Sequence, residues 1–294
     1  MSTTFIGDVS NQIQKFWSPL FEEELKEQTL LPSLVSKKYA GSIKAGGDTV
    51  YVSQINRPTG EIRTIGTDAD TFNTEKLSTS RVSIQASKRI VAAFEFEDMV
   101  MLQSQIGDQD SAIRKALLES VEIQLNNYLY SVVSPSTATP NHLLSGVSDM
   151  NAAQINIMRK LASQSQWSRN EGWWLLADPS YYSDILNAST LTSQDYVAGE
   201  TPVVGGQIVN KRFGFNILED NSAGLLTLSP ASAGADCALA FHPDFTHLVM
   251  GQPNFKVSDL HSNKQFGFVI SVDMWCGAAL GNDGDIKHIQ VYNT

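Results

Sequence analysis

The chain has 294 residues, enough for one or two domains with a sizeable hydrophobic core. Apolar residues make up 42% and charged residues 18% of it, which excludes disorder as the main state and leaves a surface rich in neutral polar groups. The 31 acidic and 21 basic residues give a net charge of -10, which opposes the phosphate neutralisation that DNA-reading proteins need. The composition therefore argues strongly against a sequence-specific DNA-binding protein.

Cysteine usage and the hydropathy pattern restrict the class of protein further. Cys237 and Cys276 lie far apart, without CxxC or Cys/His spacing, so we expect neither a disulfide framework nor a zinc knuckle and interpret both as small buried residues. The N-terminus lacks a basic start followed by an apolar run, and no stretch of about 18 apolar residues occurs. The sequence thus predicts a soluble protein of a reducing compartment.

The first predicted element is an amphipathic helix over residues 13–25. The residues on its apolar face are Ile13, Phe16, Trp17, Leu20, Phe21 and Leu25. Ser18 and Pro19 read as an N-cap and a proline at the first helical position, which predicts two short helices or one kinked helix. This apolar segment needs a surface to cover, either in its own domain or on a neighbouring subunit.

Two strand patterns enclose a long polar segment. The first follows the glycine pair at 46–47, and the second begins at Arg81 and runs on to Phe96. The intervening residues 57–80 far exceed a hairpin loop of about two to five residues. Three apolar residues are interspersed in this segment: Ile62, Ile65 and Phe72. Such a segment is either disordered or a functional extension, and its apolar residues favour an ordered two-stranded finger that packs on another surface.

The strongest helix pattern spans Ile113 to Val132, with possible N-caps at Asp108 and Asp110 and a stop imposed by Pro135. From Ser148 onward, helical and strand patterns alternate, which predicts a mixed α/β subdomain. Its expected elements are a helix through Ile155, Met158 and Leu161, a strand at 173–177, a short helix opened by Asp178 and Pro179, and a strand at 213–218. The remainder is predicted to form strands at 237–241, 247–250, 255–260, 265–276 and 286–292.

Candidates for catalysis or metal binding are sparse. No GxSxG elbow, Walker motif, HExxH helix or GxGxxG turn is present. His242, Asp244 and His247 have a spacing that can hold a metal, but Pro243 places them in a turn, where polar residues need no metal. GNDGD at 281–285 resembles part of a calcium loop, and we interpret it as the closure of a hairpin. We expect no enzyme, cofactor or metal.

The order of these parts is more informative than any single motif. The stretches that carry it are FWSPLFEEELKEQTLLPSLVSKKYAGSIKAGGDTVYV at 16–52, DQDSAIRKALLESVEIQLNNYLYS at 108–131, WWLLADPSYYSDIL at 173–186 and ALAFHPDFTHLVMG at 238–251. In this order the chain resembles the major capsid protein of tailed bacteriophages, with the Hong Kong 97 type capsid fold, over essentially its whole length. The resemblance implies an α+β fold.

The resemblance also implies a division of the chain. It comprises an N-terminal arm at 1–46, an E-loop in the form of an extended β finger at 47–91, and a peripheral domain with the long spine helix at 92–139. An axial domain follows at 140–235, and 236–294 holds closing strands shared by the axial and peripheral domains.

Partners and location follow from the same resemblance. Family members assemble as hexamers and pentamers into an icosahedral shell that encloses double-stranded DNA. The implied protein is a virion component assembled in the host cytoplasm, with no membrane partner. No long coiled-coil segment precedes the arm, so a separate scaffolding protein is implied. The other implied partners are the portal protein, a cement protein where the phage has one, and packaged DNA contacted non-specifically.

Physical reasoning agrees with this interpretation. A long finger with little core of its own must gain contacts from a neighbour to offset the entropy lost on ordering. We expect the inter-subunit interface to include Phe16, Trp17, Phe21, Arg57, Arg63, Asp68, Asp70, Glu75 and Lys76. The alternatives are an encapsulin-like nanocompartment shell that holds protein cargo and, less favoured because a nucleophile motif is missing, an α/β enzyme.

Overall fold

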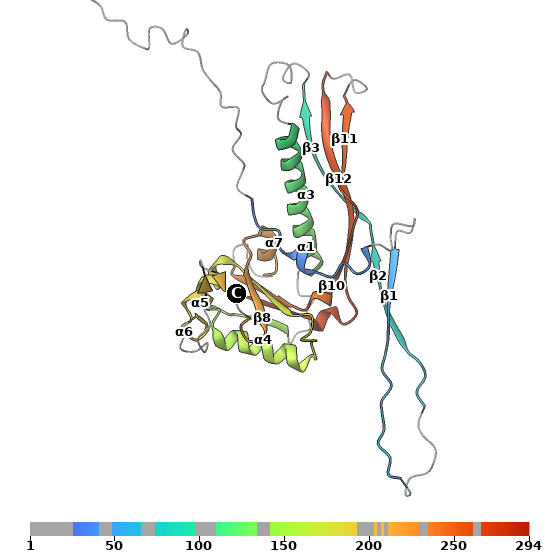
Figure 1. Cartoon of the computed structure of the whole chain (residues 1–294), viewed down its shortest axis with the longest axis vertical. Coiled ribbons are helices and arrows are strands. Elements are labelled where there is room, and N and C mark those ends of the chain that lie inside the picture. The colour runs from blue at the N-terminus through green and yellow to red at the C-terminus, as the bar shows by residue number, and fades with distance from the viewer. Residues whose placement is uncertain are drawn as a thin grey trace, which may run out of the picture.

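The chain folds into three parts, which Figure 1 shows as an α/β subdomain, an elongated sheet with one long helix beside it, and a projecting finger. The computed structural model describes residues 26–40, 49–65, 74–97, 110–133, 142–192, 203–204, 207–208, 211–229, 235–260 and 266–293. The predicted helices of the N-terminal arm lie outside the described residues. In the described part of the chain, no helix has the length and apolar character needed to cross a membrane.

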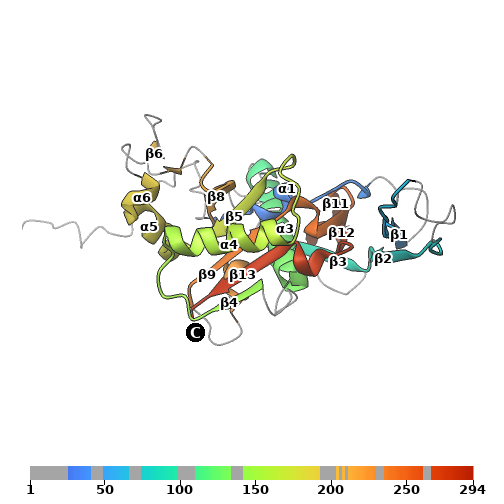
Figure 2. The same ribbon diagram turned by 90° about the horizontal axis from the view of Figure 1, so that it is seen from below.

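A five-stranded sheet with the order β4-β13-β9-β5-β8 forms the centre of the α/β subdomain. Its strands are β4 (Leu143–Ser145), β5 (Trp173–Ala177), β8 (Phe215–Glu219), β9 (Cys237–Phe241) and β13 (His288–Tyr292). Its helices are α4 (Ala152–Gln164), α5 (Pro179–Asn187), α6 (Ser189–Thr192) and α7 (Ala223–Leu226). The short strands β6 (Val203–Val204) and β7 (Gln207–Ile208) pair with each other. Seen from below, α4 lies across the strands of the sheet (Figure 2).

Both faces of this sheet are covered, which explains the continuous apolar run of β5. Trp173, Leu175 and Ala177 belong to the hydrophobic cluster that α4 and α5 share with the sheet. Trp174 and Leu176 point to the opposite face and pack in the cluster formed with the long helix. Because successive strand residues alternate between faces, a strand covered on both sides is apolar at every position.

The elongated sheet is organised around one 13-residue strand, β12 (Phe268–Leu280). Antiparallel β3 (Lys88–Phe96) pairs along one edge of β12, while β11 (Asn254–Asp259) and β10 (Thr246–Met250) pair in succession along the other edge. The predicted helix is confirmed as α3 (Asp110–Val133), which runs beside this sheet in Figure 1. Every fourth residue of α3 is buried against it: Leu117, Val121, Leu125 and Leu129.

One buried polar contact joins α3 to the α/β subdomain. The hydroxyl of Tyr130 donates to Asp220 Oδ2, and the Ser222 amide donates to Asp220 Oδ1 over 2.8 Å. Burial, followed by the negative charge of Asp220, raises the pKa of Tyr130, so this phenol remains a donor. A Cβ on Gly224 would lie 2.6 Å from the Tyr130 ring, so a glycine is required for this close packing. The short helix α1 (Leu31–Leu34) adds the buried Leu31 to the hydrophobic cluster around α3.

The predicted closing strands are confirmed, but the interpretation of GNDGD as a hairpin is wrong. β12 pairs with β3, β10 and β11, whereas β13 pairs with β4 and β9, so residues 281–285 connect two different sheets. The connection contains the 3-10 turn η8 (Gly284–Ile286), and the Gly281 amide donates to Phe245 O over 2.8 Å. Phe245 itself belongs to η6 (Pro243–Phe245), the turn between β9 and β10. This backbone contact redirects the chain from one sheet to the other.

The strand pattern that runs from Arg81 to Phe96 is also divided between two sheets. β2 (Thr79–Gln85) pairs with β1 (Thr49–Ile55) in the finger, whereas β3 pairs with β12.

The expectation that Cys237 and Cys276 are buried free thiols is confirmed.

The Tyr130–Asp220 contact predicts the effect of a single-atom deletion. Tyr130→Phe should lower the free energy of unfolding by about 1–3 kcal/mol, because it leaves a buried carboxylate without one of its donors. Urea unfolding of the variant and the wild-type subunit measures this difference. Tyr51→Phe is the control, because Tyr51 is exposed on the finger, and it should lie within about 0.5 kcal/mol of wild type. Equal losses in the two variants would contradict the assigned role of Tyr130.

Candidate assembly surfaces

The root of the finger is anchored in the body of the protein. β1 and β2 pair in antiparallel register from Thr49↔Gln85 to Ile55↔Thr79. Val52 and Ile84 form a small buried cluster with Val249 of β10. A Cβ on Gly277 of β12 would lie 2.2 Å from the carbonyl oxygen of Gln85, so the end of β2 approaches the β12 backbone at a distance that only glycine permits.

Beyond the paired strands, the two limbs of the finger stay together but have no core. The Asn56 amide donates to Ser78 O over 3.1 Å, and the Thr59 amide donates to Glu75 Oε1 over 3.1 Å. Ile62 and Ile65 are fully exposed, at 103% and 101%. The packing surface expected for these two side chains is therefore not provided by the described part of their own chain. Phe72 lies outside the described residues.

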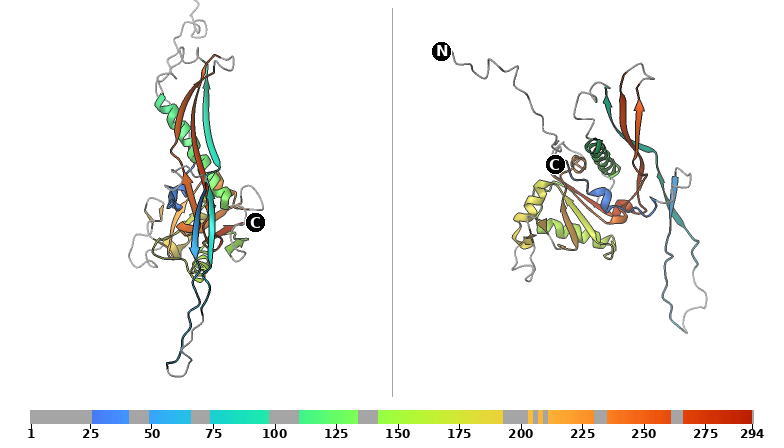
Figure 3. Two further views of the ribbon diagram at one scale, coloured as in Figure 1. Left: turned by 90° about the vertical axis from the view of Figure 1, so that its right-hand side faces the viewer. Right: turned by 45° about the horizontal axis from the view of Figure 1, so that its top comes forward.

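The finger carries several exposed apolar side chains. Tyr51, Ile55, Ile62, Ile65 and Leu77 are each at least 61% exposed. Soluble monomers rarely present a continuous group of large apolar side chains to water, and such groups mark interaction surfaces. Seen from the side, the finger and the tip of the elongated sheet point in opposite directions along the long axis (Figure 3). The finger therefore extends beyond the body of the chain.

The structure describes four of the nine predicted interface residues, and all four are exposed on the finger: Arg57, Arg63, Glu75 and Lys76. The other five lie outside the described residues: Phe16, Trp17, Phe21, Asp68 and Asp70. Arg63 pairs with Glu61 of the same limb. Arg57 and Lys76 form no ion pair with any described residue, which leaves their charges available to a neighbour.

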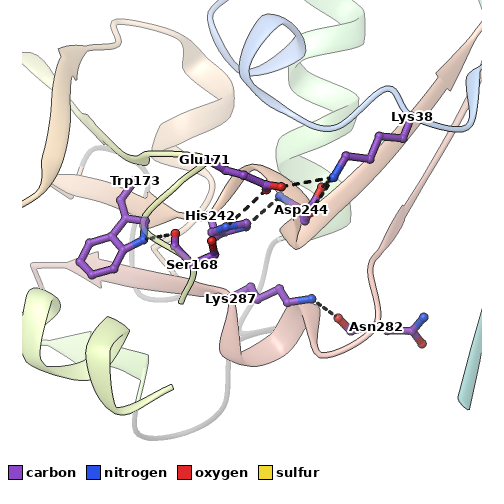
Figure 4. A network of polar contacts seen from close by, with 8 residues as sticks. All are labelled: Lys38, Ser168, Glu171, Trp173, His242, Asp244, Asn282 and Lys287. Atoms are coloured by element: carbon purple, nitrogen blue, oxygen red, sulfur yellow. Dashed lines mark hydrogen bonds and ion pairs between the residues drawn. The ribbon is translucent and has the colours of Figure 1, made fainter. Parts of the chain in front are cut away.

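A polar cluster near the finger root brings together residues that are distant in sequence (Figure 4). Lys38 Nζ lies 2.8 and 2.9 Å from the two carboxylate oxygens of Asp244 and 3.6 Å from Glu171 Oε1. His242 Nε2 lies 3.5 Å from Glu171 Oε2. The sequence singled out His242 and Asp244 through their spacing, but Lys38 and Glu171 carried no signal. His247, the third predicted member, packs edge-on against Tyr39 instead, with 5.0 Å between ring centroids.

The chemistry of this cluster favours a network of ion pairs over a metal centre. Glu171, His242 and Asp244 lie close enough to share an ion. However, the Asp244 amide donates to His242 Nδ1, so the proton of a neutral ring sits on Nε2, where a metal would need a lone pair. Lys38 already supplies a positive charge. Burial alone would raise the pKa of Asp244, but the bond and charge of Lys38 outweigh it and lower that pKa.

The described histidines are buried and uncharged near neutral pH. Burial lowers the pKa of His142, His242 and His247, and lowers that of His288 to about 4. His288 Nδ1 lies 2.6 Å from Gly284 O in the turn between the two sheets. His142, His242 and His288 act as neutral hydrogen-bonding groups, and the neutral His247 ring packs against Tyr39.

Comparison with known proteins identifies the fold. No protein-family model and no curated protein sequence matches the chain. Among solved structures, a chain from the cyanophage Pam1 capsid is 12% identical, with a TM-score of 0.75 and coverage of 97% of each chain. A chain from Mycobacterium phage Che8 is 18% identical, with a TM-score of 0.73 and coverage of 96% of this chain and 97% of that chain. A chain from the cyanophage P-SCSP1u capsid is 12% identical, with a TM-score of 0.72 and coverage of 97% and 94%.

The likeness extends over the fold as a whole. An α/β subdomain, an elongated sheet with a spine helix and a projecting finger are matched over nearly the full length of these phage chains. The expected α+β fold of the Hong Kong 97 capsid type is therefore confirmed. This likeness in fold is found at only 12–18% sequence identity.

Gly277 provides a test of the finger root. Gly277→Ala should lower the free energy of unfolding by about 1–3 kcal/mol, because the added methyl group collides with the Gln85 carbonyl. The matched control is Gly60→Ala, since nothing lies within 4 Å of a Cβ at that position. Thermal unfolding of both subunits measures the contrast. Similar stabilities of the two variants would show that the close approach at Gly277 is unimportant.

His288 predicts a pH dependence of stability. Its pKa is about 4 in the folded chain and has an ordinary value of 6.5, so the unfolded chain binds the proton first as pH falls. Its stabilising contribution is therefore complete above pH 6.5 and declines by about 3 kcal/mol towards pH 4. His288→Gln should reduce the stability lost between pH 7 and pH 4 by that amount, measured by urea unfolding at both pH values. An unchanged loss would contradict the assignment.

Proposed function

We propose that this chain is the major capsid protein of a tailed phage, which assembles as hexamers and pentamers into an icosahedral shell around double-stranded DNA. The observation that carries the proposal is the finger. It is anchored at its root and exposes several large apolar side chains, including the fully exposed Ile62 and Ile65, on a chain with a phage capsid fold. Burying these side chains against a neighbouring subunit removes them from water and stabilises the assembled shell.

The finer assignments extend this proposal. The division at residues 46, 91, 139 and 235 into arm, E-loop, peripheral domain, axial domain and closing strands accords with the separate finger, spine helix and α/β sheet. In the proposed shell, Phe16, Trp17 and Phe21 of the arm cover a neighbouring subunit. The chain acts without catalysis, with a separate scaffolding protein, the portal and, where one exists, a cement protein as its partners. It is assembled in the host cytoplasm and has no membrane partner.

The net charge supports a shell that holds DNA without gripping it. A charge of -10 repels the phosphate backbone, so packaged DNA is contacted non-specifically and weakly. A nanocompartment shell for protein cargo is the other container that this fold suits. Every comparison structure described above comes from a phage, which favours the phage capsid.

The finger provides the direct test of this function. Wild-type protein expressed with its scaffolding protein should form closed particles of megadalton mass, observed by electron microscopy and light scattering. Ile62→Asp combined with Ile65→Asp should abolish these particles and leave the subunit's melting temperature unchanged, because both side chains are fully exposed in the single chain. The control, Ile62→Leu with Ile65→Leu, should assemble normally. A wild-type chain that remains monomeric would refute the capsid function.

A further inference from the structure

A recess on the α/β subdomain gathers positive charge in an otherwise acidic protein. It has a volume of about 340 Å³ and is lined by Arg159, Arg169, Trp173, Lys211, Phe213 and Gly214. Arg159 comes from α4, Arg169 from the loop before β5, and Lys211 from the turn before β8. None of these three cations forms an ion pair with any described residue. The three are also separated from one another in the sequence. The fold alone brings them together.

The walls of the recess are held in place by specific contacts. The Trp173 indole donates to Ser168 O over 2.9 Å, which fixes the loop that carries Arg169 (Figure 4). The Arg169 guanidinium lies 5.8 Å from the centre of the Trp173 ring. A Cβ on Gly172 would lie 3.9 Å from Lys211 Nζ, so the lysine extends over that glycine. The charges are therefore presented on a defined surface rather than on freely moving side chains.

The turn at the rim of the recess has an unusual backbone. Phe213 and Gly214 have φ values of 49° and 93°, and two hydrogen bonds between Arg212 and Phe215 close the turn. A bulky residue in the left-handed region is uncommon, and such strained positions gather at functional sites. This turn places the half-exposed Phe213 ring beside Lys211. The recess therefore offers an apolar contact together with three positive charges.

We propose that this recess is the docking site for the finger of a neighbouring copy of the chain, specifically for the segment 61–75. The proposal rests on the proposed capsid function and identifies the surface that receives the finger. Segment 61–75 carries four carboxylates, those of Glu61, Asp68, Asp70 and Glu75, against one arginine, a net charge of -3. It also presents Ile62 and Ile65 without any apolar partner in the described residues. Both charge and apolar character thus complement the recess.

The observations favour this occupant over the chain's own finger and over nucleic acid. The root of the chain's own finger, at 54–57, lines a separate recess with residues 165–168 and Glu171, and the described limbs beyond it extend past the subdomain (Figure 1), so a neighbour's finger is the proposed occupant. Duplex DNA is bound by cations spread along its phosphates, whereas here three cations converge in one recess of a chain with net charge -10. A short acidic peptide segment fits such a recess better than a duplex.

Charge reversal in the recess tests the proposal in the full-length protein. Arg159→Glu combined with Arg169→Glu should lower the yield of closed particles about tenfold, because like charges then face each other at every copy of the contact. The control is Lys160→Glu, which makes one such charge reversal on the next residue of α4, outside the recess, and is compared with Arg159→Glu alone. This control should assemble like wild type. Circular dichroism and melting temperature establish that each variant subunit is folded. If the double arginine variant does not fold, Lys211→Glu is used in its place.

A charge swap identifies the partner. Asp68→Lys with Asp70→Lys should hinder assembly alone and restore at least part of the yield when combined with the reversed recess. As a second readout, a synthetic peptide of residues 61–75 should bind the unassembled subunit, and its variant with both aspartates changed to asparagine should bind more weakly. Absence of rescue together with absence of peptide binding would overturn the assignment.

Failure of this inference is distinguishable from failure of the capsid function. Wild-type particles combined with normal assembly of the reversed recess would overturn the docking site and leave the capsid function intact. Normal assembly with a reduced DNA content of the particles would also overturn it, and would assign the recess to nucleic acid. A wild-type chain that never assembles would refute the capsid function itself.

Discussion

The buried face of α3 is the contact on which the rest of the structure depends. Leu117, Val121, Leu125 and Leu129 belong to one hydrophobic cluster that also includes β12 of the elongated sheet and β5 and β9 of the α/β sheet. One helix therefore packs against two sheets, and burying each of these four side chains contributes about 1.5–3 kcal/mol. Because the finger root rests on β12 at Gly277, the same helix also determines where the finger leaves the body.

This arrangement produces a subunit that is stable at its centre and incomplete at its edge. The α/β sheet is covered on both faces, while the finger extends outward with Ile62 and Ile65 in water. A finger anchored at its root loses less entropy on docking than a free loop, since part of its ordering is already established on folding. In the proposed shell, the apolar side chains of the finger that a single copy exposes to water are buried at each subunit boundary. The small free energy of each contact is repeated over many copies.

Polar contacts connect the parts of the body to one another. Tyr130 and Asp220 join the helix to the subdomain, and Lys38 neutralises Asp244 where the segment after α1 meets the turn between β9 and β10. The buried histidines remain neutral because burial lowers the pKa of each.

The sequence by itself determined the local elements, because the hydrophobic periods of helices and strands depend only on residues that are close together in the sequence. The patterns at 113–132, at 173–177 and in the five C-terminal strands predicted elements that the structure confirms, and the order of parts indicated the fold. Only the tertiary structure decided which sheet each strand joins. GNDGD turned out to connect two sheets because Gly281 bonds to Phe245, a contact between residues far apart in the chain. The pairing of Lys38 with Asp244 and the convergence of Arg159, Arg169 and Lys211 are likewise non-local, and no spacing in the sequence encodes them.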